Sequence, residues 1–371
     1  MEKFQVSLKK VVDDSYEICI GEQLSEQMTG DLASGLVGNV NKFALITDST
    51  VGPLYAEPVL ERLRALGFTC DLFVIPAGEE HKTREEKARI EDEMLEKGYR
   101  RDCCVVAVGG GVVTDLAGFL AGTFARGVPF VNYATTLLAA ADASIGGKTA
   151  VDTPLATNLI GLFYQPKKVY IDLAAWRTLP KRQIISGMAE TIKHACLADS
   201  AFFSYLEEHM EEILRLDPDC CREIAKNNCR IKYEVVMQDE RESGLREVLN
   251  LGHTVGRAVE TVSGYQLMHG EAVGIGLAAA CELSVKAGIM PTEDAKRVHV
   301  LLEKAGLPVR VPSYVDTDTL LKKLYTDKKV RNGRLRFVLP MRIGRIYQVA
   351  DNDFGFPVTE EQAKEAILAI S

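Results

Sequence analysis

Apolar runs alternate with helical patterns through the first half of the chain, and this alternation constrains the fold more than any other feature. Strands without polar alternation are usually buried on both faces, and strands joined by helices usually run parallel. We therefore predict an α/β protein that begins with a Rossmann-like parallel sheet. The apolar runs cover residues 42–51, 70–78 and 103–111, and the helical patterns cover 58–68, 83–99 and 112–125.

From Leu179–Pro180 onward, the pattern changes to long helical segments with little strand signal. A chain of 371 residues is long enough for two domains of roughly 150 residues each. We predict a Rossmann-like domain over residues 1–179 and a mainly α-helical domain over residues 180–371. The helical patterns cover residues 181–198, 201–216, 221–240 and 271–289.

The charge balance argues against a nucleic-acid partner. Lys and Arg total 44 against 52 Asp and Glu, so the net charge is −8, whereas nucleic-acid-binding proteins usually carry the opposite sign. No stretch approaches the roughly 18 continuous apolar residues of a membrane span, and the N-terminal residues lack a signal-peptide core. Nine cysteines without a CxxC pair indicate reduced, mostly buried thiols. We expect a cytoplasmic protein without membrane contact.

Three glycines, Gly109 to Gly111, separate an apolar run from a helical pattern. Their backbone N–H groups and the helix N-terminus can hold a diphosphate. The polar turns DST at 48–50 and GEEHKT at 78–83 follow other runs of the same predicted sheet, where carboxylates can bind ribose hydroxyls. A tight turn without a ligand would also explain the glycines alone. Three such turns on one edge favour a dinucleotide.

Two histidines, His253 and His269, each lie beside a glycine on what are predicted to be successive helices. Glu190 lies in the apolar helical stretch SGMAETIKHA, where an unpaired carboxylate would be costly to bury. Two imidazoles and one carboxylate leave an open position on zinc or a similar ion, as catalytic sites require. Alternatively, the histidines are hydrogen-bonded core residues, and Glu190 pairs with Lys193 or His194 on the helix surface.

Basic residues recur at separated points of the chain. Each alone is typical of a surface charge, but gathered around one cleft they would bind a small substrate with several negative charges. These residues are Arg126, Lys148, Lys232, Arg246, Arg257, Lys328 and Lys329.

Seven ordered motifs resemble those of one protein family. They are GGGVVTDLAGF, ARG, TTLLAAADASIGGKTAVDTP, NLIGLFYQP, GMAETIKH, LNLGHTVG and HGEAVGIG. From about Asp48 to about Leu339, the chain resembles 3-dehydroquinate synthase and the wider family of sugar-phosphate cyclases. The resemblance implies an N-terminal NAD-binding domain, a helical C-terminal domain, one zinc or cobalt ion in the cleft between them, and a homodimer.

The reaction that the resemblance implies converts 3-deoxy-D-arabino-heptulosonate 7-phosphate, a phosphorylated sugar acid, into 3-dehydroquinate and phosphate. This is the second step of the shikimate pathway, which leads to chorismate and the aromatic amino acids. The implied enzyme is a lyase in which NAD oxidises the substrate transiently. Phosphate elimination, re-reduction and an aldol ring closure follow, so NAD is recycled.

Position by position, the resemblance implies a role for each candidate residue. Glu190, His253 and His269 match the metal ligands, in agreement with the set proposed from the residues alone. The matches to NAD contacts are Asp48, Glu79, Lys82, Gly110, Gly111, Asp115, Thr135, Thr136, Lys148, Thr157 and Thr178. The matches to catalytic and substrate residues are Asp142, Lys148, Asn158, Lys193, Lys232, Arg246, Asn250 and Lys328, with Arg126 reaching the phosphate pocket of the partner subunit.

Two positions depart from the family pattern. The family usually has GHxxGHA where this chain reads GHTVGRA, so Arg257 replaces a histidine near the phosphate. Arginine binds phosphate but cannot act as a base near neutral pH, and we therefore expect Arg257 to contact the substrate phosphate. Thr157 in PLATN replaces a lysine that is common next to the cofactor.

Three alternatives to this function are compatible with parts of the sequence. A cyclase for another sugar phosphate would keep the NAD and metal sites, and a glycerol-dehydrogenase-like polyol oxidoreductase would share the architecture. A catalytically silent relative would bind NAD and regulate a partner. The complete set Glu190, His253 and His269 argues against the silent relative, whereas Arg257 is the one feature that favours it.

Overall fold

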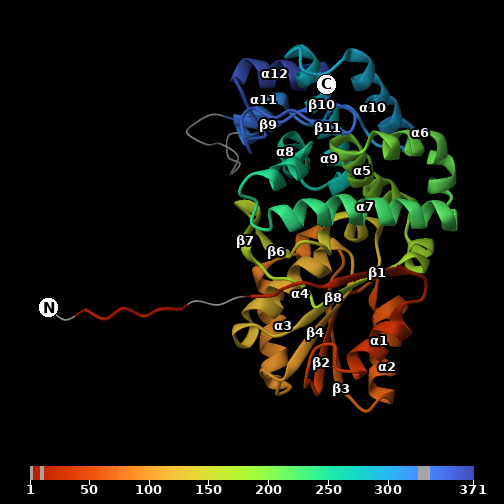
Figure 1. Ribbon diagram of the computed structural model, residues 1–371, viewed down its shortest axis with the longest axis vertical. Coiled ribbons are helices and arrows are strands. Elements are labelled where there is room, and N and C mark those ends of the chain that lie inside the picture. The colour runs from red at the N-terminus through yellow and green to blue at the C-terminus, as the bar shows by residue number, and fades with distance from the viewer. Residues whose placement is uncertain (1–2, 9–11, 325–334) are drawn as a thin grey trace.

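The computed structural model describes residues 3–8, 12–324 and 335–371. A sheet-containing half and a helical half lie one above the other in Figure 1. The first half contains a six-stranded sheet in which every neighbouring pair is parallel, as predicted. In sheet order its strands are β1 (Glu17–Gly21), β8 (Lys168–Asp172), β5 (Phe130–Ala134), β4 (Cys103–Gly109), β2 (Lys42–Asp48) and β3 (Thr69–Ile75).

Helices cover both faces of this sheet, because successive residues of its strands point to opposite sides. Phe43 and Leu45 of β2 belong to one buried cluster, whereas Ala44 and Ile46 belong to another. The first cluster includes residues of α1 (Ser25–Ala33) and α2 (Glu57–Ala65), which follows the short turn η1 (Gly52–Ala56). The second includes residues of α3 (Arg84–Glu96) and α4 (Gly111–Thr123). The prediction of a sheet covered on both faces is therefore confirmed.

A two-stranded hairpin that the sequence analysis did not predict projects from the sheet half. It pairs β6 (Lys148–Thr153) with β7 (Ala156–Phe163) in antiparallel register. The hairpin packs closely against α4. At Gly118 of α4, an added Cβ would lie only 2.4 Å from the Thr149 side chain of β6. The hairpin brings two candidate residues, Lys148 and Asn158, toward the helical half.

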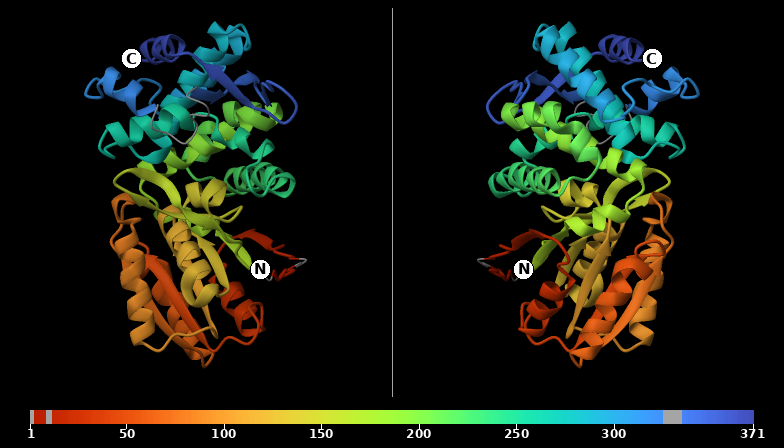
Figure 2. Two further views of the ribbon diagram at one scale, coloured as in Figure 1. Left: turned by 90° about the vertical axis from the view of Figure 1, so that its left-hand side faces the viewer. Right: turned by 90° about the vertical axis from the view of Figure 1, so that its right-hand side faces the viewer.

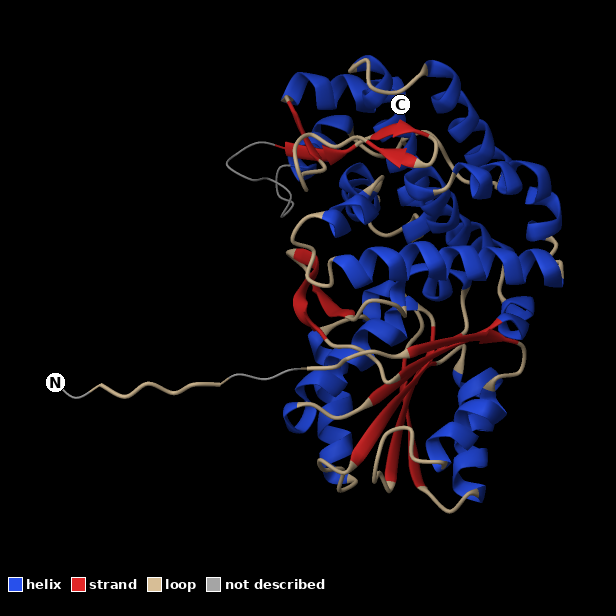
Figure 3. Ribbon diagram, viewed as in Figure 1, coloured by secondary structure: helices blue, strands red, loops and turns tan. Residues whose placement is uncertain are grey.

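Helices dominate the rest of the chain, as Figure 3 shows by colour. The helices are α5 (Lys181–Ala198), α6 (Ser200–Leu214), α7 (Pro218–Gln238), α8 (His253–Val262), α9 (His269–Lys286), α10 (Thr292–Lys304), α11 (Thr317–Leu324) and α12 (Glu360–Ala369). Short helical turns are η2 (Glu79–His81), η3 (Phe124–Arg126), η4 (Ala139–Ala143), η5 (Leu173–Thr178) and η6 (Leu245–Asn250). Within the described residues 335–371, four short strands also occur: β9 (Leu335–Val338), β10 (Pro340–Arg342), β11 (Arg345–Ile346) and β12 (Gly355–Val358).

One hydrophobic core runs from the sheet into the helical half. Val169 and Ile171 of β8 and Ala134 of β5 belong to the same buried cluster as Met188 of α5 and Val273 of α9. The views of Figure 2 show the sheet half, in red to yellow, directly below the helical half, in green to blue. The two halves are therefore joined by a continuous packed interior on the β5 and β8 side, whereas the hairpin lies at another part of the junction.

The cysteines and the helices agree with the composition. All nine cysteines lie in the described residues as free thiols, and eight of them are buried. Across residues 3–8, 12–324 and 335–371, no helix combines the length and the apolar character needed to cross a bilayer.

Candidate metal centre and substrate cleft

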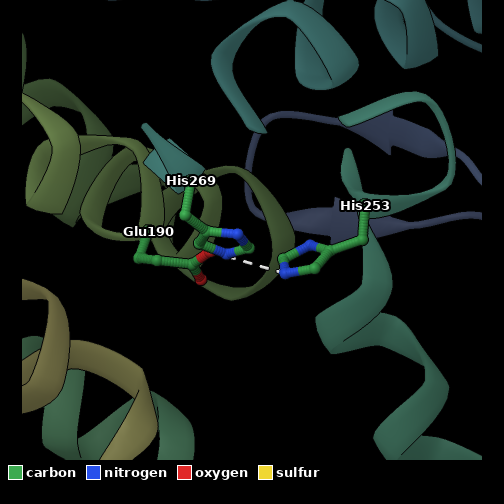
Figure 4. A group of neighbouring side chains, drawn as sticks. All are labelled: Glu190, His253 and His269. Carbon is green, nitrogen blue, oxygen red and sulfur yellow. Dashed lines mark ion pairs between the residues drawn. The ribbon is translucent and has the colours of Figure 1, made fainter. Parts of the chain in front are cut away.

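Three side chains from three helices of the helical half converge at one point, two of them buried and one partly exposed (Figure 4). Glu190 lies in the middle of α5, His253 is the first residue of α8, and His269 is the first residue of α9. The Nε2 atoms of both histidines lie 3.6 Å from Glu190 Oε1. One ligand atom from each residue falls within 4.8 Å of the others. The three residues proposed from the sequence are therefore neighbours in the structure.

Glycines bring these helices close enough for the side chains to meet. A Cβ at Gly276 of α9 would lie 1.8 Å from the carbonyl oxygen of Gly252, the residue before His253. A Cβ at Gly270, directly after His269, would lie 1.9 Å from the Ser186 carbonyl oxygen of α5. Both distances are far shorter than a van der Waals contact, so any larger residue would separate the helices. Gly270, beside His269, and Gly276, one to two turns farther along α9, thus set the spacing of the helices that carry the metal candidates.

Neighbouring acceptors hold both imidazoles with their Nε2 atoms toward Glu190. His253 Nδ1 lies 3.2 Å from the Leu251 carbonyl oxygen, and His269 Nδ1 lies 3.2 Å from Glu260 Oε2. An Nδ1–H that donates to such an acceptor leaves Nε2 as the lone-pair nitrogen, which is the usual arrangement of histidine ligands. Glu260 was not identified from the sequence, because its role appears only when α8 and α9 are packed together.

The electrostatics of the three residues fit a divalent cation. Glu190 is fully buried, and neither carboxylate oxygen has a hydrogen-bond partner among the described residues, although the Lys193 ammonium lies beside it. Burial acts to raise the pKa of Glu190, but Lys193 and His253 outweigh it and lower the pKa. Such a carboxylate, ionised and short of donors, is costly to bury without a cation. Two imidazoles and one carboxylate suit zinc or a related ion and leave room for a substrate oxygen.

The two histidines differ in protonation before an ion binds. Burial and the nearby Lys193 ammonium hold the pKa of His253 well below its usual range. Burial also opposes the charged form of His269, but Glu260 and Glu190 raise its pKa to about 10. Ligand histidines must be neutral, so metal binding would release a proton from His269.

A second group with ligand atoms within 4.8 Å of one another contains Asp142, Glu190 and His194. Asp142 is ion-paired with Lys232, and His194 Nδ1 lies 3.0 Å from Asn228 Oδ1. Asp142 and His194 therefore already have polar partners, Lys232 and Asn228. The group offers one imidazole instead of two, so His253 and His269 make the better set with Glu190.

A cavity of about 330 Å³ lies between the hairpin and helices α7 and α8. Five predicted substrate residues line it: Asp142, Lys148, Asn158, Lys232 and Arg257. Asp115, a predicted NAD contact, lines it as well. The structure therefore brings together predicted substrate residues that are far apart in the sequence. The outermost two, Asp142 and Arg257, are 115 positions apart.

A glutamate that the sequence analysis missed joins two of the predicted residues. Glu242 lines the cavity, accepts a 2.6 Å hydrogen bond from Lys148 Nζ, and accepts another of 2.6 Å from Asn250 Nδ2. Its backbone has a positive φ of 58°, which is uncommon for a residue with a side chain. Burial lowers the pKa of Lys148 to about 7, although Glu242 opposes this effect. The only local signal was a cluster of acidic residues, which is also typical of an exposed loop.

Three predicted residues lie outside this cavity lining. Lys193 is buried beside Glu190. Arg246 is fully buried, and its guanidinium donates to the carbonyl oxygens of Glu240 and Gly146 while its Nε lacks a partner. Asn250 reaches the lining only through its bond to Glu242. Lys328 lies outside the described residues.

Arg126 lies apart from all other candidates. It is exposed at the turn after α4 and lines a different hollow together with Arg101 and Tyr99. Ala125, Arg126 and Gly127 all have positive φ, at 51°, 71° and 109°. A left-handed backbone at two successive non-glycine residues is strained. Such a conformation is kept only when the surrounding structure holds it in place. Arg126 therefore cannot serve this chain's own cavity in the observed arrangement.

The predicted NAD contacts gather at the carboxyl edge of the sheet. Gly110 and Gly111 join β4 to α4, and a Cβ at Gly110 would lie 3.0 Å from Thr136 Cγ2. Thr135 follows β5. Asp48 ends β2 and accepts from the backbone of the next turn. On the same edge, Thr178 follows β8 and contacts Tyr55 Oη at 2.7 Å, and Thr157 lines a smaller cavity beside the hairpin.

Lys82 is the centre of a buried charge cluster at this edge. Its ammonium is paired with Glu79 and lies 3.6 Å from Asp115 and 3.8 Å from Asp152. Burial raises the pKa of Asp115 to about 7, with Lys82 opposing the shift. Asp152 belongs to β6, so the cluster links the turn after β3, helix α4 and the hairpin.

Comparisons with known proteins agree with this geometry. A 3-dehydroquinate synthase N-terminal model matches residues 72–186, and the corresponding C-terminal model matches residues 187–330. The chain is 42% identical over 368 residues to a 3-dehydroquinate synthase of Vibrio atlanticus, covering 99% of this chain and 98% of the relative.

Solved structures of two sugar-phosphate cyclases are also similar. One is a 2-deoxy-scyllo-inosose synthase complexed with carbaglucose-6-phosphate, NAD+ and Co2+, with a TM-score of 0.87 at 25% identity over 95% of this chain and 96% of that one. The other is the 2-epi-5-epi-valiolone synthase ValA from Streptomyces hygroscopicus subsp. jinggangensis with NAD+ and Zn2+, with a TM-score of 0.87 at 29% identity over 99% of both chains.

Proposed function

The chain belongs to the 3-dehydroquinate synthase family, and on that premise we propose that it converts 3-deoxy-D-arabino-heptulosonate 7-phosphate into 3-dehydroquinate and phosphate. The observation that carries the proposal is one cavity, lined by Lys148, Lys232 and Arg257, in the same part of the molecule as the convergent Glu190, His253 and His269. The lining has four basic residues against three acidic ones, and its cations suit a substrate that carries both a carboxylate and a phosphate. The reaction class is a phosphate-eliminating carbon–oxygen lyase.

The proposed cofactors are NAD and one zinc or cobalt ion. The turn at Gly110 and Gly111 and the hydroxyls of Thr135 and Thr136 support a dinucleotide at the sheet edge. The solved relatives that hold NAD+ with Co2+ or Zn2+ support the same cofactors. Bound NAD would take up and return a hydride, and the bound ion would acidify the hydroxyl that is oxidised.

The chain's own residues position the substrate and its protons. Lys193 and Lys232 bring buried ammonium groups beside Glu190 and Asp142, where they can donate to substrate hydroxyls. We assign Lys148 and Asn158, which line the cavity, to the substrate carboxylate, together with Asn250, which is bonded to Glu242 of the lining. Because Glu242 accepts hydrogen bonds from Lys148 and Asn250, a substrate carboxylate that binds these donors must compete with it.

Arg257 is assigned to the substrate phosphate. Its guanidinium is half-buried and has no hydrogen-bond or ion-pair partner in the described part of the chain. A planar guanidinium binds phosphate through two parallel hydrogen bonds. Since arginine cannot accept a proton near neutral pH, the phosphate itself is the proposed acceptor for the proton removed before elimination.

A homodimer in the cytoplasm completes the proposal. The exposed, strained position of Arg126, away from this chain's cavity, supports its reaching a partner subunit's phosphate pocket. We retain the boundary at 179–180 between the NAD-binding and the helical domain, because it lies between η5 and α5. Arg246 is proposed to act outside the cavity lining, where its hydrogen bond to the Gly146 carbonyl oxygen holds the backbone just before Lys148.

One assay tests this function against its rivals. The purified enzyme with zinc or cobalt and a small amount of NAD is mixed with the heptulosonate phosphate, and phosphate and 3-dehydroquinate are followed together. We expect equal amounts of both products without accumulation of NADH. Phosphate without dehydroquinate would favour another cyclase product, stoichiometric NADH would indicate a polyol oxidoreductase, and no product would indicate a silent relative. A Glu190→Gln variant is the inactive control.

A further inference from the structure

A second, smaller cavity of about 70 Å³ lies beside the substrate cavity. It is formed by the tip of the β6–β7 hairpin, one face of α8, and residues from the loop after α8 and from α11. Its lining includes Thr157, Arg257, Thr261, Tyr265 and Lys323. Neither the proposed metal ligands nor the proposed substrate contacts account for Tyr265 and Lys323.

Arg257 lines both cavities and forms part of the wall between them. A guanidinium carries five N–H donors in one plane, so its different edges can donate in two directions. No described residue accepts a hydrogen bond from the Arg257 side chain. An anion in either cavity would therefore offset the cost of holding this cation half-buried.

The small cavity has the chemistry of an oxyanion site. Its lining combines two cationic side chains, Arg257 and Lys323, with four hydroxyl-bearing and five apolar residues, and no aspartate or glutamate lines it. Burial raises the pKa of Tyr265, and the carboxylates of Asp152 and Glu260 add to this effect, so the phenol keeps its proton and can donate. Two cations and several hydroxyl donors without an acidic residue in the lining favour a compact anion over a neutral ligand.

The volume of the cavity also matches a compact anion. Each water-sized atom needs about 10–15 Å³ of such space. A volume of about 70 Å³ therefore holds roughly five atoms of this size, which corresponds to an orthophosphate ion. A sugar phosphate is too large for it.

We propose that this cavity is a second oxyanion site, in which inorganic phosphate binds across Arg257 from the substrate. The proposal rests on the proposed function, because that reaction releases phosphate in the neighbouring cavity. Phosphate that leaves the substrate can then move along the Arg257 guanidinium without exchanging at once with bulk water. The anion in the small cavity and the substrate in the large one can be bound at the same time.

Binding stoichiometry tests the proposal directly, with inorganic phosphate as the probe. The metal-loaded enzyme with NAD is titrated with phosphate by calorimetry and by phosphorus NMR. We expect two phosphates per chain in the wild type, and about tenfold weaker binding of one of them in Lys323→Met, because a charge-assisted hydrogen bond is lost. Tyr265→Phe should weaken the same phosphate. Lys322→Met is the matched control, since Lys322 is exposed on the same helix and does not line the cavity.

Product inhibition provides a second readout. Phosphate should inhibit the wild type with a noncompetitive component against the heptulosonate phosphate, and this component should disappear in Lys323→Met while kcat/KM stays within about twofold. One phosphate per chain, or purely competitive inhibition in the wild type, would overturn the proposal. Two sites without NAD but one with NAD would assign the cavity to the cofactor and would also overturn it. Formation of dehydroquinate in the same samples tests the proposed function separately.

Discussion

Replacing Arg257 with alanine should reduce kcat/KM by about ten- to hundredfold. A hydrogen bond to a charged group contributes about 1.5–3 kcal/mol, and each 1.4 kcal/mol corresponds to a factor of ten. We take one to two such bonds of the weaker kind, because the guanidinium is half-buried and solvent partly replaces what is lost. The loss should raise KM, because the bound substrate carries the phosphate, and it should also lower kcat, because the departing phosphate gains negative charge in the transition state.

The assay measures phosphate release and dehydroquinate formation at varied substrate concentrations, together with the metal content of each variant. Metal content is needed because Arg257 lies one helical turn after His253 on α8. Arg257→Ala should keep its metal, which separates loss of a phosphate contact from damage to the metal centre. Arg222→Ala, which changes an exposed arginine on α7, serves as the matched control.

Arg257→His adds a test of the same idea through pH. Histidine is the residue that the family usually places at this position, so the variant should retain appreciable activity. Its pH profile should gain a group that titrates near the ordinary histidine value of about 6.5, which is absent from the wild-type profile if arginine supplies the charge. If Arg257→Ala left both kcat and KM unchanged, Arg257 would be an ordinary surface arginine and the reasoning would be refuted.

Three further predictions concern the metal, the cofactor and the buried charge cluster. Glu190→Gln should weaken metal binding by more than about a hundredfold while the protein stays folded, because ligands contribute more than their supporting residues; full metal content by elemental analysis would contradict this. NAD at a small fraction of the substrate concentration should support complete conversion without a rise in NADH absorbance, and a stoichiometric rise would refute recycling. Because burial raises the folded-state pKa of Asp115 to about 7, its contribution to stability is fully present below its ordinary value of about 3.8 and is lost as pH rises toward about 7. Asp115→Asn should therefore raise the melting temperature relative to wild type more at pH 8 than at pH 5, and an equal shift at both pH values would argue against the raised pKa.

The parallel sheet and the metal ligands could be predicted from the sequence because each depends on local patterns. The apolar run at 103–111 needs burial on both faces, and the strand Cys103–Gly109 follows from that requirement. The histidines beside Gly252 and Gly270, together with a carboxylate in an apolar helical stretch, indicated a metal site, and the structure brings them together with Glu190. In these cases the local signal and the tertiary role coincide.

Other parts of the site depend on contacts that no local pattern encodes. The hairpin over residues 148–163 was missed because its strands face a helix on one side and a cavity on the other, which hides the usual alternation. Glu242 and Glu260 look like ordinary acidic residues until Lys148 and His269 are brought to them by packing. The complete burial of Arg246 is likewise set by Glu240 and Gly146, residues that meet it only in the folded chain.

The continuous core that joins β5 and β8 to the helices has a mechanical consequence. Val169 and Ile171 pack with Met188 in one dry interior, and sliding such surfaces would open voids that cost several kcal/mol. The two halves are therefore held together most rigidly where β5 and β8 pack against the helices. The opposite side consists of the hairpin and the face of α8, which are separated by the two cavities instead of by packed side chains. A rotation about β8 that narrows the two cavities is therefore the motion that would disturb this core least, and it would displace Asn158 of the hairpin relative to the metal ligands.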